Sequence, residues 1–487
     1  MASTISSDGT PTNGADPWID SLVWGGQWTD AGGIVTITYS IETGTAPAAV
    51  FSGSGADWHS YEIVALEAAY AAWEAVANIE FVEVLNNANI ENWLGSDAQV
   101  GALGWHNIPI NNAIMPLYGV FSYQGTGWTS TGLLEGGYGF VTLIHEIGHG
   151  LGLAHPHDGG SAGDATNFPG VTSAFGDYGD YNLNQGIWTT MSYNDGWPAE
   201  ITSGDYTYGW QATPMALDIA AIQAIYGANT TYASGSDTYV LPDANGSGTF
   251  WSCIWDTAGI DTISHAGGTN AAVINLNDAP LAADPANAGG FVSYADGIVG
   301  GFTIANGVMI ENAIGGNGND HITGNEGDNS ISGGMGDDRA LGGFGDDAVL
   351  GEVGNDRLSG GSGDDLIYAG DGNDHISGGS GNDVLDGGSG DDWILGGDGD
   401  DALYGGSGSD VFVFLDMTAS TQDVIHDFED GVDLIQMSLN AYLGQSAEAG
   451  DILIQQDGTD TVVTCGNSTI ILLNIASSVI DGDDFLI

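Results

Sequence analysis

The sequence has no lysine and only two arginines, Arg339 and Arg357, among 487 residues, against 65 acidic residues. The resulting formal charge of −63 excludes the basic surface that nucleic acids and anionic membranes require. Cysteine is equally scarce: Cys253 and Cys465 are far apart and have no CxxC spacing, which favours two buried thiols over one disulfide. We therefore expect an acidic protein that attracts cations and binds no nucleic acid.

Long apolar stretches are also missing. No run reaches the roughly 18 apolar residues of a membrane span, so we expect no membrane insertion. The first residues have neither a positively charged nor an apolar region, so we expect no Sec signal peptide. The length is sufficient for two or three domains with sizeable cores.

Residues 145–155 read HEIGHGLGLAH and contain three histidines and a glutamate. His145 and His149 are four residues apart and share one face of a helix, which the apolar spacing before them predicts. A glycine after them can end the helix in the left-handed conformation and turn His155 back toward the first two. Three neutral imidazoles would form the protein half of a tetrahedral zinc site with an open position for water. Glu146 could take a proton from that water.

The longer string HExxHxxGxxH matches the metzincin signature, which includes a downstream methionine turn. Met191 in TTMSYND lies 36 residues after His155, where a methionine could form an apolar floor beneath the ligands. The alternatives are a helix with scattered surface histidines and an ordinary core methionine. Because both elements occur together, the sequence favours one catalytic Zn²⁺.

Glycine, with 81 residues, becomes periodic in the second half. From Gly315 to Val413 the chain consists of eleven consecutive nonapeptides such as GGSGDDLIY. The eighth position is large and apolar in ten repeats, with Ala340 as the gap, and the sixth is aspartate in ten, with Asn329 as the exception. The ten aspartates are Asp320, Asp338, Asp347, Asp356, Asp365, Asp374, Asp383, Asp392, Asp401 and Asp410.

Each half of this repeat has a physical role. The glycines permit tight turns, and the aspartate adds a hard oxygen ligand of the kind that calcium prefers. The apolar residue then points from a short strand into a flattened solenoid, the parallel β-roll of RTX proteins. A flexible linker would have no reason to keep phase over eleven units. Without calcium the carboxylates should repel one another and keep the segment unfolded.

Two further helices are expected, over residues 60–77 and 214–227. The predicted fold class is an α/β metzincin zinc-protease domain over residues 18–230, followed by an all-β calcium-binding parallel β-roll (RTX) domain over residues 231–487. Residues 1–17 are an N-terminal segment that could be a short pro-segment.

Both motifs together resemble the serralysins, bacterial secreted metzincins that pair a zinc protease domain with an RTX β-roll. Similar stretches include DPWIDSLVWGGQW, IWDTAGIDTISHAG, GFTIANGVMIENAIGG and DVIHDFEDGVDLI. The resemblance implies that His145, His149 and His155 bind zinc and that Glu146 is the general base in peptide hydrolysis. It also implies that Tyr193 ligates zinc at rest and swings away to hydrogen-bond the developing oxyanion.

Further expectations come from the same resemblance. Several Ca²⁺ ions are implied, with Asp237 and Asp261 at calcium-loop positions, although Ala258 interrupts the usual glycine pair. Residues 484–487, DFLI, resemble the family's export signal for the type I secretion apparatus, which implies a secreted, extracellular protein. The expected substrates are proteins and peptides, and the expected state is a monomer.

Two departures and two alternatives remain. Gly150 stands where relatives commonly have alanine, which we expect to loosen the end of the helix, and His157 is interpreted as a loop residue. The chain could instead be a calcium-dependent surface or adhesion protein with a vestigial protease domain, or a zinc hydrolase acting on something other than peptides. The intact set of Glu146, three histidines and Tyr193 favours the protease.

Overall fold

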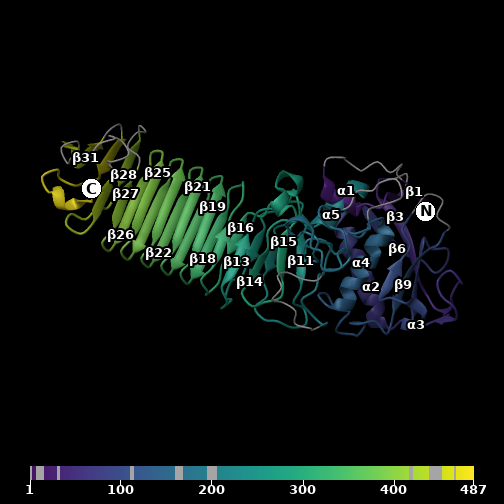
Figure 1. Ribbon diagram of the computed structural model, residues 1–487. Coiled ribbons are helices and arrows are strands. Elements are labelled where there is room, and N and C mark those ends of the chain that lie inside the picture. The colour runs from purple at the N-terminus through teal and green to yellow at the C-terminus, as the bar shows by residue number, and fades with distance from the viewer. Residues whose placement is uncertain are drawn as a thin grey trace.

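The computed structural model describes residues 3–6, 16–29, 33–109, 115–158, 168–194, 206–415, 421–437, 452–465 and 468–486. The molecule is elongated, with a mixed α/β part at one end and a long β-roll extending from it toward the C-terminus (Figure 1). Within the described residues, no helix is both long and apolar enough to cross a membrane.

The α/β part has one five-stranded sheet, in the order β6-β3-β7-β9-β8. Its strands are β3 (Val35–Glu42), β6 (Ile79–Glu83), β7 (Ile90–Gly95), β8 (Gly104–His106) and β9 (Leu117–Ser122). All are parallel except β8, which pairs antiparallel with β9 and forms one edge. The helices are α1 (Pro17–Leu22), α2 (Ser60–Val76), α3 (Asp97–Val100), α4 (Tyr138–Leu151) and α5 (Ala216–Tyr226).

The two helices expected from apolar spacing are present, with small differences at their ends. α2 ends at Val76, one residue before the predicted end, and α5 begins two residues later than predicted. Of the predicted N-terminal segment, residues 1–2 and 7–15 lie outside the described residues. β1 (Ser3–Ser6) pairs antiparallel with β2 (Gly26–Thr29), and β4 (Gly44–Thr45) with β5 (Ser54–Gly55).

From β10 onward the chain forms two twelve-stranded sheets. The first roll sheet has the order β10 (Thr238–Val240), β12 (Thr262–Ser264), β16 (Asn312–Ile314), β18 (Ser330–Met335), β20 (Ala348–Val353), β22 (Leu366–Asp371), β24 (Val384–Ser389), β26 (Ala402–Ser407), β28 (Gln422–Ile425), β32 (Ser468–Leu472), β31 (Asp460–Cys465) and β30 (Leu453–Asp457). The second roll sheet has the order β11 (Trp251–Ile254), β15 (Gly301–Ile304), β14 (Ser293–Ala295), β13 (Ala272–Asn275), β17 (His321–Thr323), β19 (Arg339–Phe344), β21 (Arg357–Ser362), β23 (His375–Ser380), β25 (Trp393–Asp398), β27 (Val411–Phe414), β29 (Leu434–Met437) and β33 (Phe485–Leu486). The fold class predicted from the sequence is confirmed.

Consecutive repeats alternate between the two sheets, so each strand pairs in parallel with the strand two repeats later. The eighth-position side chains all point between the sheets and are 0–2% exposed, from Ile322 to Phe412. Ala340, the small residue in that row, is fully buried as well. Period-two alternation on a short strand thus produces a roll with one apolar interior.

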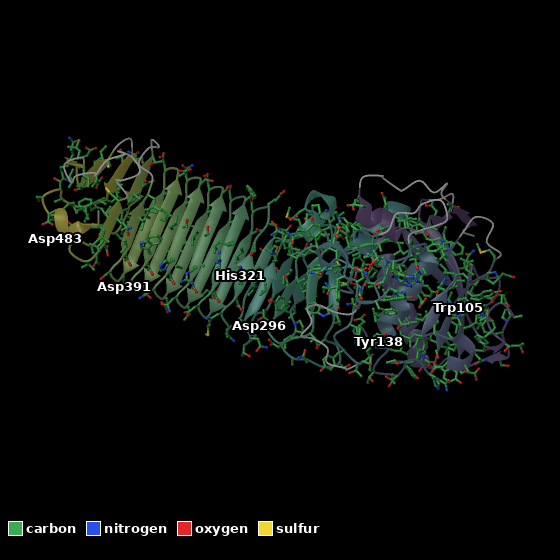
Figure 2. All side chains as sticks on the ribbon, viewed as in Figure 1. Trp105, Tyr138, Asp296, His321, Asp391 and Asp483 are labelled. Atoms are coloured by element: carbon green, nitrogen blue, oxygen red, sulfur yellow. The ribbon has the colours of Figure 1, made fainter. Side chains whose placement is uncertain are left out.

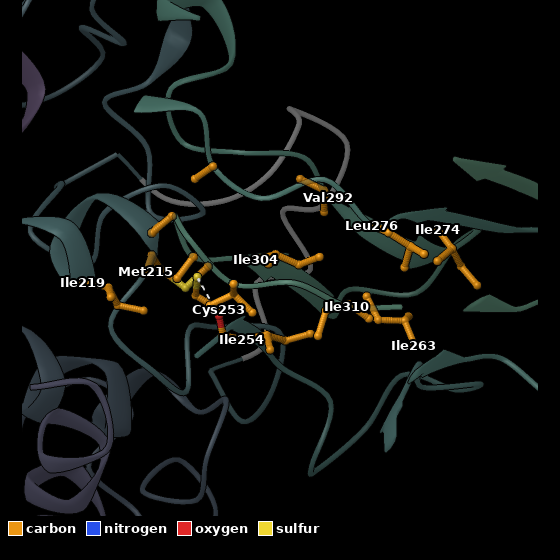
Figure 3. Packing of buried hydrophobic residues seen from close by; sticks show 14 of the residues in the cluster. Met215, Ile219, Cys253, Ile254, Ile263, Ile274, Leu276, Val292, Ile304 and Ile310 are labelled. Atoms are coloured by element: carbon orange, nitrogen blue, oxygen red, sulfur yellow. Dashed lines mark hydrogen bonds between the residues drawn. The ribbon is translucent and has the colours of Figure 1, made fainter. Parts of the chain in front are cut away.

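The hydrophobic core is continuous between the α/β part and the roll. Met215 and Ile219 of the α5 region lie beside Cys253 and Ile254 of β11 (Figure 3). Cys253 and Cys465 are both buried, and there is no disulfide between them. Burial of this shared apolar surface couples the stability of the two parts.

Candidate zinc centre and calcium rows

α4 carries the first two histidines of the motif. Its apolar residues Phe140, Leu143 and Ile147 are at most 1% exposed, which fixes that face of the helix against the core. Trp73 of α2 also donates its indole N–H to the carbonyl of Ile144 at 3.2 Å. The ligand face of α4 is therefore held in one orientation.

Gly152 ends α4 and reverses the chain. Its φ of 107° lies in the left-handed region, which a side chain would make costly. The returning segment is held by two backbone bonds, from Trp24 N–H to the Gly152 carbonyl at 2.9 Å and from Ala154 N–H to the Leu22 carbonyl at 2.8 Å. This turn places His155 opposite the two helix histidines, as the glycine pattern predicts.

The three histidines converge through their Nε2 atoms. Nε2 of His155 lies 3.1 Å from Nε2 of His145 and 3.0 Å from Nε2 of His149. Each Nδ1 faces an acceptor: the Thr190 carbonyl for His145 (2.7 Å), the Leu153 carbonyl for His149 (2.9 Å) and the Asp158 carboxylate for His155 (2.5 Å). With Nδ1 donating, the three Nε2 lone pairs point at one another, an arrangement that a shared metal ion would stabilise.

Burial keeps the two helix histidines neutral. It lowers the pKa of His145 to about 3, with His155 as the next cause, and lowers the pKa of His149 well below its usual value. Neutral imidazole is the form that binds metal. Both the geometry and the charge state therefore fit Zn²⁺.

Glu146 lies between the helix and the sheet edge. Its side chain is 8% exposed, and burial raises its pKa to about 8. A Cβ on Gly104 of β8 would lie 3.0 Å from Cγ of Glu146, so this glycine makes room for the carboxylate. Both residues line a cleft of about 480 Å³ that also contains His145 and Tyr193.

Tyr193 stands at the open side of the histidine cluster. Its ring centroid is 4.4 Å from that of His155 and 5.6 Å from that of His145, and 38% of its surface is exposed. Burial, with Glu146 as the next cause, raises the pKa of its phenol to about 12. His157 stacks on His155 with a centroid distance of 4.9 Å and lies in the loop that the sequence predicts.

Met191 lies beneath the ligand helix and is fully buried. A Cβ on Gly148 of α4 would lie 2.7 Å from the Met191 sulfur. The glycine between the two helix histidines is therefore what allows the thioether to approach the ligand helix.

Asp218 anchors this turn, and the sequence reasoning did not single it out. It is fully buried at the start of α5 and accepts hydrogen bonds from Thr189 Oγ1 (2.5 Å), Thr190 N–H (2.6 Å), Thr190 Oγ1 (2.8 Å) and Met215 N–H (2.9 Å). Since the Thr190 carbonyl faces Nδ1 of His145, Asp218 orients a ligand through one intervening residue. Its position as an acidic residue in the first turn of the predicted helix is the sequence feature that could have indicated its role.

Gly150 has a packing role besides the loosening expected from the sequence. α4 continues through it to Leu151, and a Cβ there would overlap the buried imidazole of His106 in β8. His106 is 8% exposed and Nδ1 faces the Asn107 carbonyl at 2.8 Å. The glycine thus accommodates a large neighbour across the helix–sheet interface.

Replacing Gly150 with alanine is expected to lower the unfolding free energy by about 1–3 kcal/mol, because the His106 ring must move within a packed core. In a Gly150→Ala, His106→Ala double variant the two losses should not add, since the overlap is gone. Denaturant unfolding of the four proteins at fixed zinc and calcium measures this coupling. Strictly additive losses would contradict the described contact.

The sixth-position aspartates form two rows, one along each edge of the roll. Each is 0–3% exposed. In nine of the ten, Oδ1 accepts the backbone N–H of the residue eighteen positions earlier, for example Asp320 N–H to Asp338 Oδ1 at 2.7 Å, whereas Asp320 Oδ1 accepts the N–H of Ala272. Among the described residues, the buried Oδ2 atom has no hydrogen-bond partner in eight of them, namely Asp338, Asp347, Asp356, Asp365, Asp374, Asp383, Asp392 and Asp401. Buried carboxylate oxygens need a partner, and a calcium ion in the turn supplies one.

Both rows extend past the last repeat. Asp401 N–H donates to Asp423 Oδ1 and Asp410 N–H donates to Asp433 Oδ1, each at 3.1 Å. The nonapeptide spacing does not include these two residues, because the intervening loops break its phase. At Asn329, in contrast, Oδ1 accepts the N–H of Asn325 and Nδ2 donates to the Glu311 carbonyl. The side-chain oxygen therefore has a hydrogen-bond partner.

Asp237 and Asp261 lie together before β10 and β12. Asp237 N–H donates to Asp261 Oδ1 at 2.7 Å, and Asp256 joins them in a group whose carboxylate oxygens lie within 4.8 Å of one another. Burial raises the pKa of Asp261 to about 6. Asp256, missed in the sequence, completes a set of oxygen donors that suits a cation.

Comparison with known proteins agrees with this architecture. The family "Peptidase M10 serralysin C terminal" matches residues 216–449. The chain is 31% identical over 333 residues to "Metallopeptidase AprA" of Pseudomonas marginalis, covering 62% of each protein, and 34% identical over 286 residues to "Serralysin" of Proteus mirabilis, covering 53% of each. Among solved structures, "Structure of myroilysin" covers 42% of this chain and 96% of that one, at 16% identity and a TM-score of 0.25, which is too low to support an argument.

The described residues form an α/β part with a histidine cluster and a parallel β-roll, and one of the similar proteins is a metallopeptidase by name. The chain is similar to the serralysins, and residues 216–449 match the model of their C-terminal domain. It spans 53–62% of the length of these two relatives.

Proposed function

We infer that the chain is a zinc-dependent endopeptidase that hydrolyses peptide bonds in proteins. The observation that carries this proposal is the convergence of three imidazole Nε2 atoms beside a buried carboxylate in an open cleft. His145, His149 and His155 would hold the zinc ion. When bound, zinc supplies Lewis acidity toward the substrate carbonyl and toward water.

In this proposal the substrate backbone binds along the edge strand β8. It is the last strand of its sheet and borders the cleft at Gly104. An edge strand offers unpaired N–H and C=O groups, so an extended peptide can bind as one further strand. Such a peptide would lie along the cleft that contains Glu146.

Two side chains then handle the proton and the developing charge. Glu146, whose pKa of about 8 a bound zinc ion would lower, would take a proton from the attacking water and pass it to the leaving amine. The phenol of Tyr193 stays protonated at neutral pH because its pKa is about 12, so its hydroxyl can donate a hydrogen bond to the oxyanion. Met191 and Asp218 keep the ligand positions fixed.

The roll is proposed to bind several Ca²⁺ ions through the two aspartate rows and the Asp237 group. Similarity to the serralysins supports secretion to the extracellular space through a type I secretion apparatus, and a monomer is expected. β33 (Phe485–Leu486) pairs with β29 at the end of the second roll sheet, and Ile487 lies outside the described residues.

Removing zinc is expected to abolish casein hydrolysis, and about one zinc ion per chain should restore it. The chelator must be zinc-selective and calcium must be kept constant, so that the roll is unaffected. Hydrolysis rate and zinc content are measured on the same samples. A zinc-free chain that still hydrolyses casein would refute the proposal, and a zinc-loaded chain that cuts no protein would favour the adhesion alternative.

A further inference from the structure

The only two arginines of the chain lie side by side on one outer face of the roll. Arg339 in β19 pairs in register with Arg357 in β21. The same row continues with His321 on one side and with His375 and then Trp393 on the other. These five residues, here called the Arg339 row, occupy neighbouring strands and extend about 19 Å along the roll.

The Arg339 row faces outward. Each member precedes a buried eighth-position residue, so its side chain lies on the opposite face of the strand; the first four are exposed and Trp393 is half-buried. In Figure 2 the row starts at the labelled His321 and runs toward β25, which begins at Trp393, two residues after the labelled Asp391.

Pairing these arginines has a cost. Like charges directly opposite each other on a sheet are destabilising, and in the described part of the chain neither guanidinium forms an ion pair with a carboxylate. With only two cationic side chains among 487 residues, their placement in register is an unusual concentration of positive charge. An anion bound across Arg339 and Arg357 would offset the repulsion.

The neighbouring groups indicate the class of ligand. Guanidinium groups bind carboxylates and sulfates in a bidentate manner. Trp393 and His375, with ring centroids 5.6 Å apart, offer flat faces on which a sugar ring can pack. Ser359 and Ser377 lie two residues further along the same strands, on the same face, and add hydroxyls that can bond to sugar hydroxyls.

We propose that the Arg339 row binds a linear acidic polysaccharide lying along the axis of the roll. A peptide strand fits less well, because β17 through β27 have neighbours on both sides and offer no free edge. Two arginines are too small a footprint for duplex nucleic acid. This binding site is independent of the proposed protease activity.

The high negative charge of the protein restricts the conditions for binding. At physiological ionic strength charges beyond roughly 8 Å are screened, so only nearby carboxylates oppose the ligand. One of them is the exposed carboxylate of Asp337, whose pKa is lowered by hydrogen bonds from Asn355 and also by the charge of Arg357. Bound calcium would offset the charge of the buried turn aspartates, such as Asp338 and Asp356. Binding is therefore calcium-dependent and weakens with salt.

The test uses the full chain with calcium and measures binding to polygalacturonate and to dextran sulfate, with neutral dextran as the blank. The Arg339→Gln, Arg357→Gln double variant should bind at least about tenfold more weakly, and Trp393→Ala several-fold more weakly. Leu366→Gln, at the same repeat position on the first roll sheet, is the matched control and should bind like wild type. Unchanged strand signal and casein hydrolysis show that the variants are folded.

A tenfold loss for either anionic polymer supports the proposal, and the polymer that shows the larger loss identifies carboxylate or sulfate as the preferred group. Equal binding by wild type and the double variant overturns it. So does equal binding to neutral dextran, absence of binding by wild type, or competition by duplex DNA as strong as that by polygalacturonate.

Discussion

Replacing Glu146 with alanine is expected to lower casein hydrolysis at least about 10²-fold while leaving about one zinc ion per chain. The three nitrogen atoms that would bind zinc belong to histidines, so removing the carboxylate leaves the donor set intact. What is lost is the group that accepts the proton of the attacking water. Hydrolysis rate and zinc content, determined on both proteins, give the two readouts.

Two further variants make this result specific. Glu67→Ala removes an exposed carboxylate from α2 and should leave activity unchanged. His149→Ala should lose zinc as well as activity, because it removes one of three converging donors. If Glu146→Ala keeps wild-type activity, the general-base assignment is wrong; if it loses zinc together with activity, the role of Glu146 is structural.

Removing calcium is expected to unfold most of the roll and to abolish most of its strand signal in circular dichroism. Eight buried Oδ2 atoms in the described turns have no hydrogen-bond partner, and parallel rows of carboxylates repel one another when no cation lies between them. Burying such groups without a cation opposes folding, whereas burial of the apolar row favours it. Calcium titration of the chelated full chain should restore the signal cooperatively.

Asp365 and Asp364 provide a matched pair for this experiment. Asp365 belongs to the buried rows, whereas Asp364 is exposed in the same turn, at a repeat position where this chain has aspartate, asparagine or serine. Asp365→Asn should raise the calcium concentration needed for folding several-fold, and Asp364→Asn should change it little. Equal strand signal with and without calcium would contradict the calcium-gated fold.

The calcium-free roll is expected to retain more strand at about pH 5.5 than at about pH 8. Burial, reinforced by neighbouring carboxylates, raises the pKa of Asp338, Asp347, Asp383 and Asp392 from 3.8 to about 7. Because the folded form favours the protonated acid, this contribution to stability is complete below about pH 4 and is lost as the pH rises through 7. Circular dichroism in chelator across this range measures it, and greater strand content at pH 8 would contradict the argument.

The sequence predicts what depends on local spacing and misses what depends on contacts between distant segments. The ligand helix, the glycine turn before His155 and the eleven repeats are all periodic or contiguous, so their geometry follows from residue spacing. Asp218 reaches the methionine turn across 28 residues, and Asp237 meets Asp256 and Asp261 only when β10 and β12 pair. Neither relationship leaves a fixed interval in the chain.

The same distinction explains why the sequence did not indicate the packing role of Gly150. A glycine near the end of a helix is ordinarily a source of flexibility, and only the position of His106, more than forty residues earlier, shows that it makes space as well. Propensity describes a residue in isolation, whereas packing depends on the neighbour that the fold supplies.

Because the repeats alternate between two sheets, the number of repeats before a strand, even or odd, decides in which sheet that strand lies; we call this the parity of the roll. One full turn contains eighteen residues, so adding or removing two repeats leaves every later strand in its original sheet. Adding or removing one repeat would transfer all later strands to the opposite sheet, and with them the aspartates to the opposite edge. Arg339 and Arg357 are neighbours only because an even number of repeats separates them, and the strands that close the C-terminal end fit only a roll of the correct parity. The roll can therefore gain or lose two repeats at a time. The gain or loss of a single nonapeptide would instead exchange the sheets of all later strands.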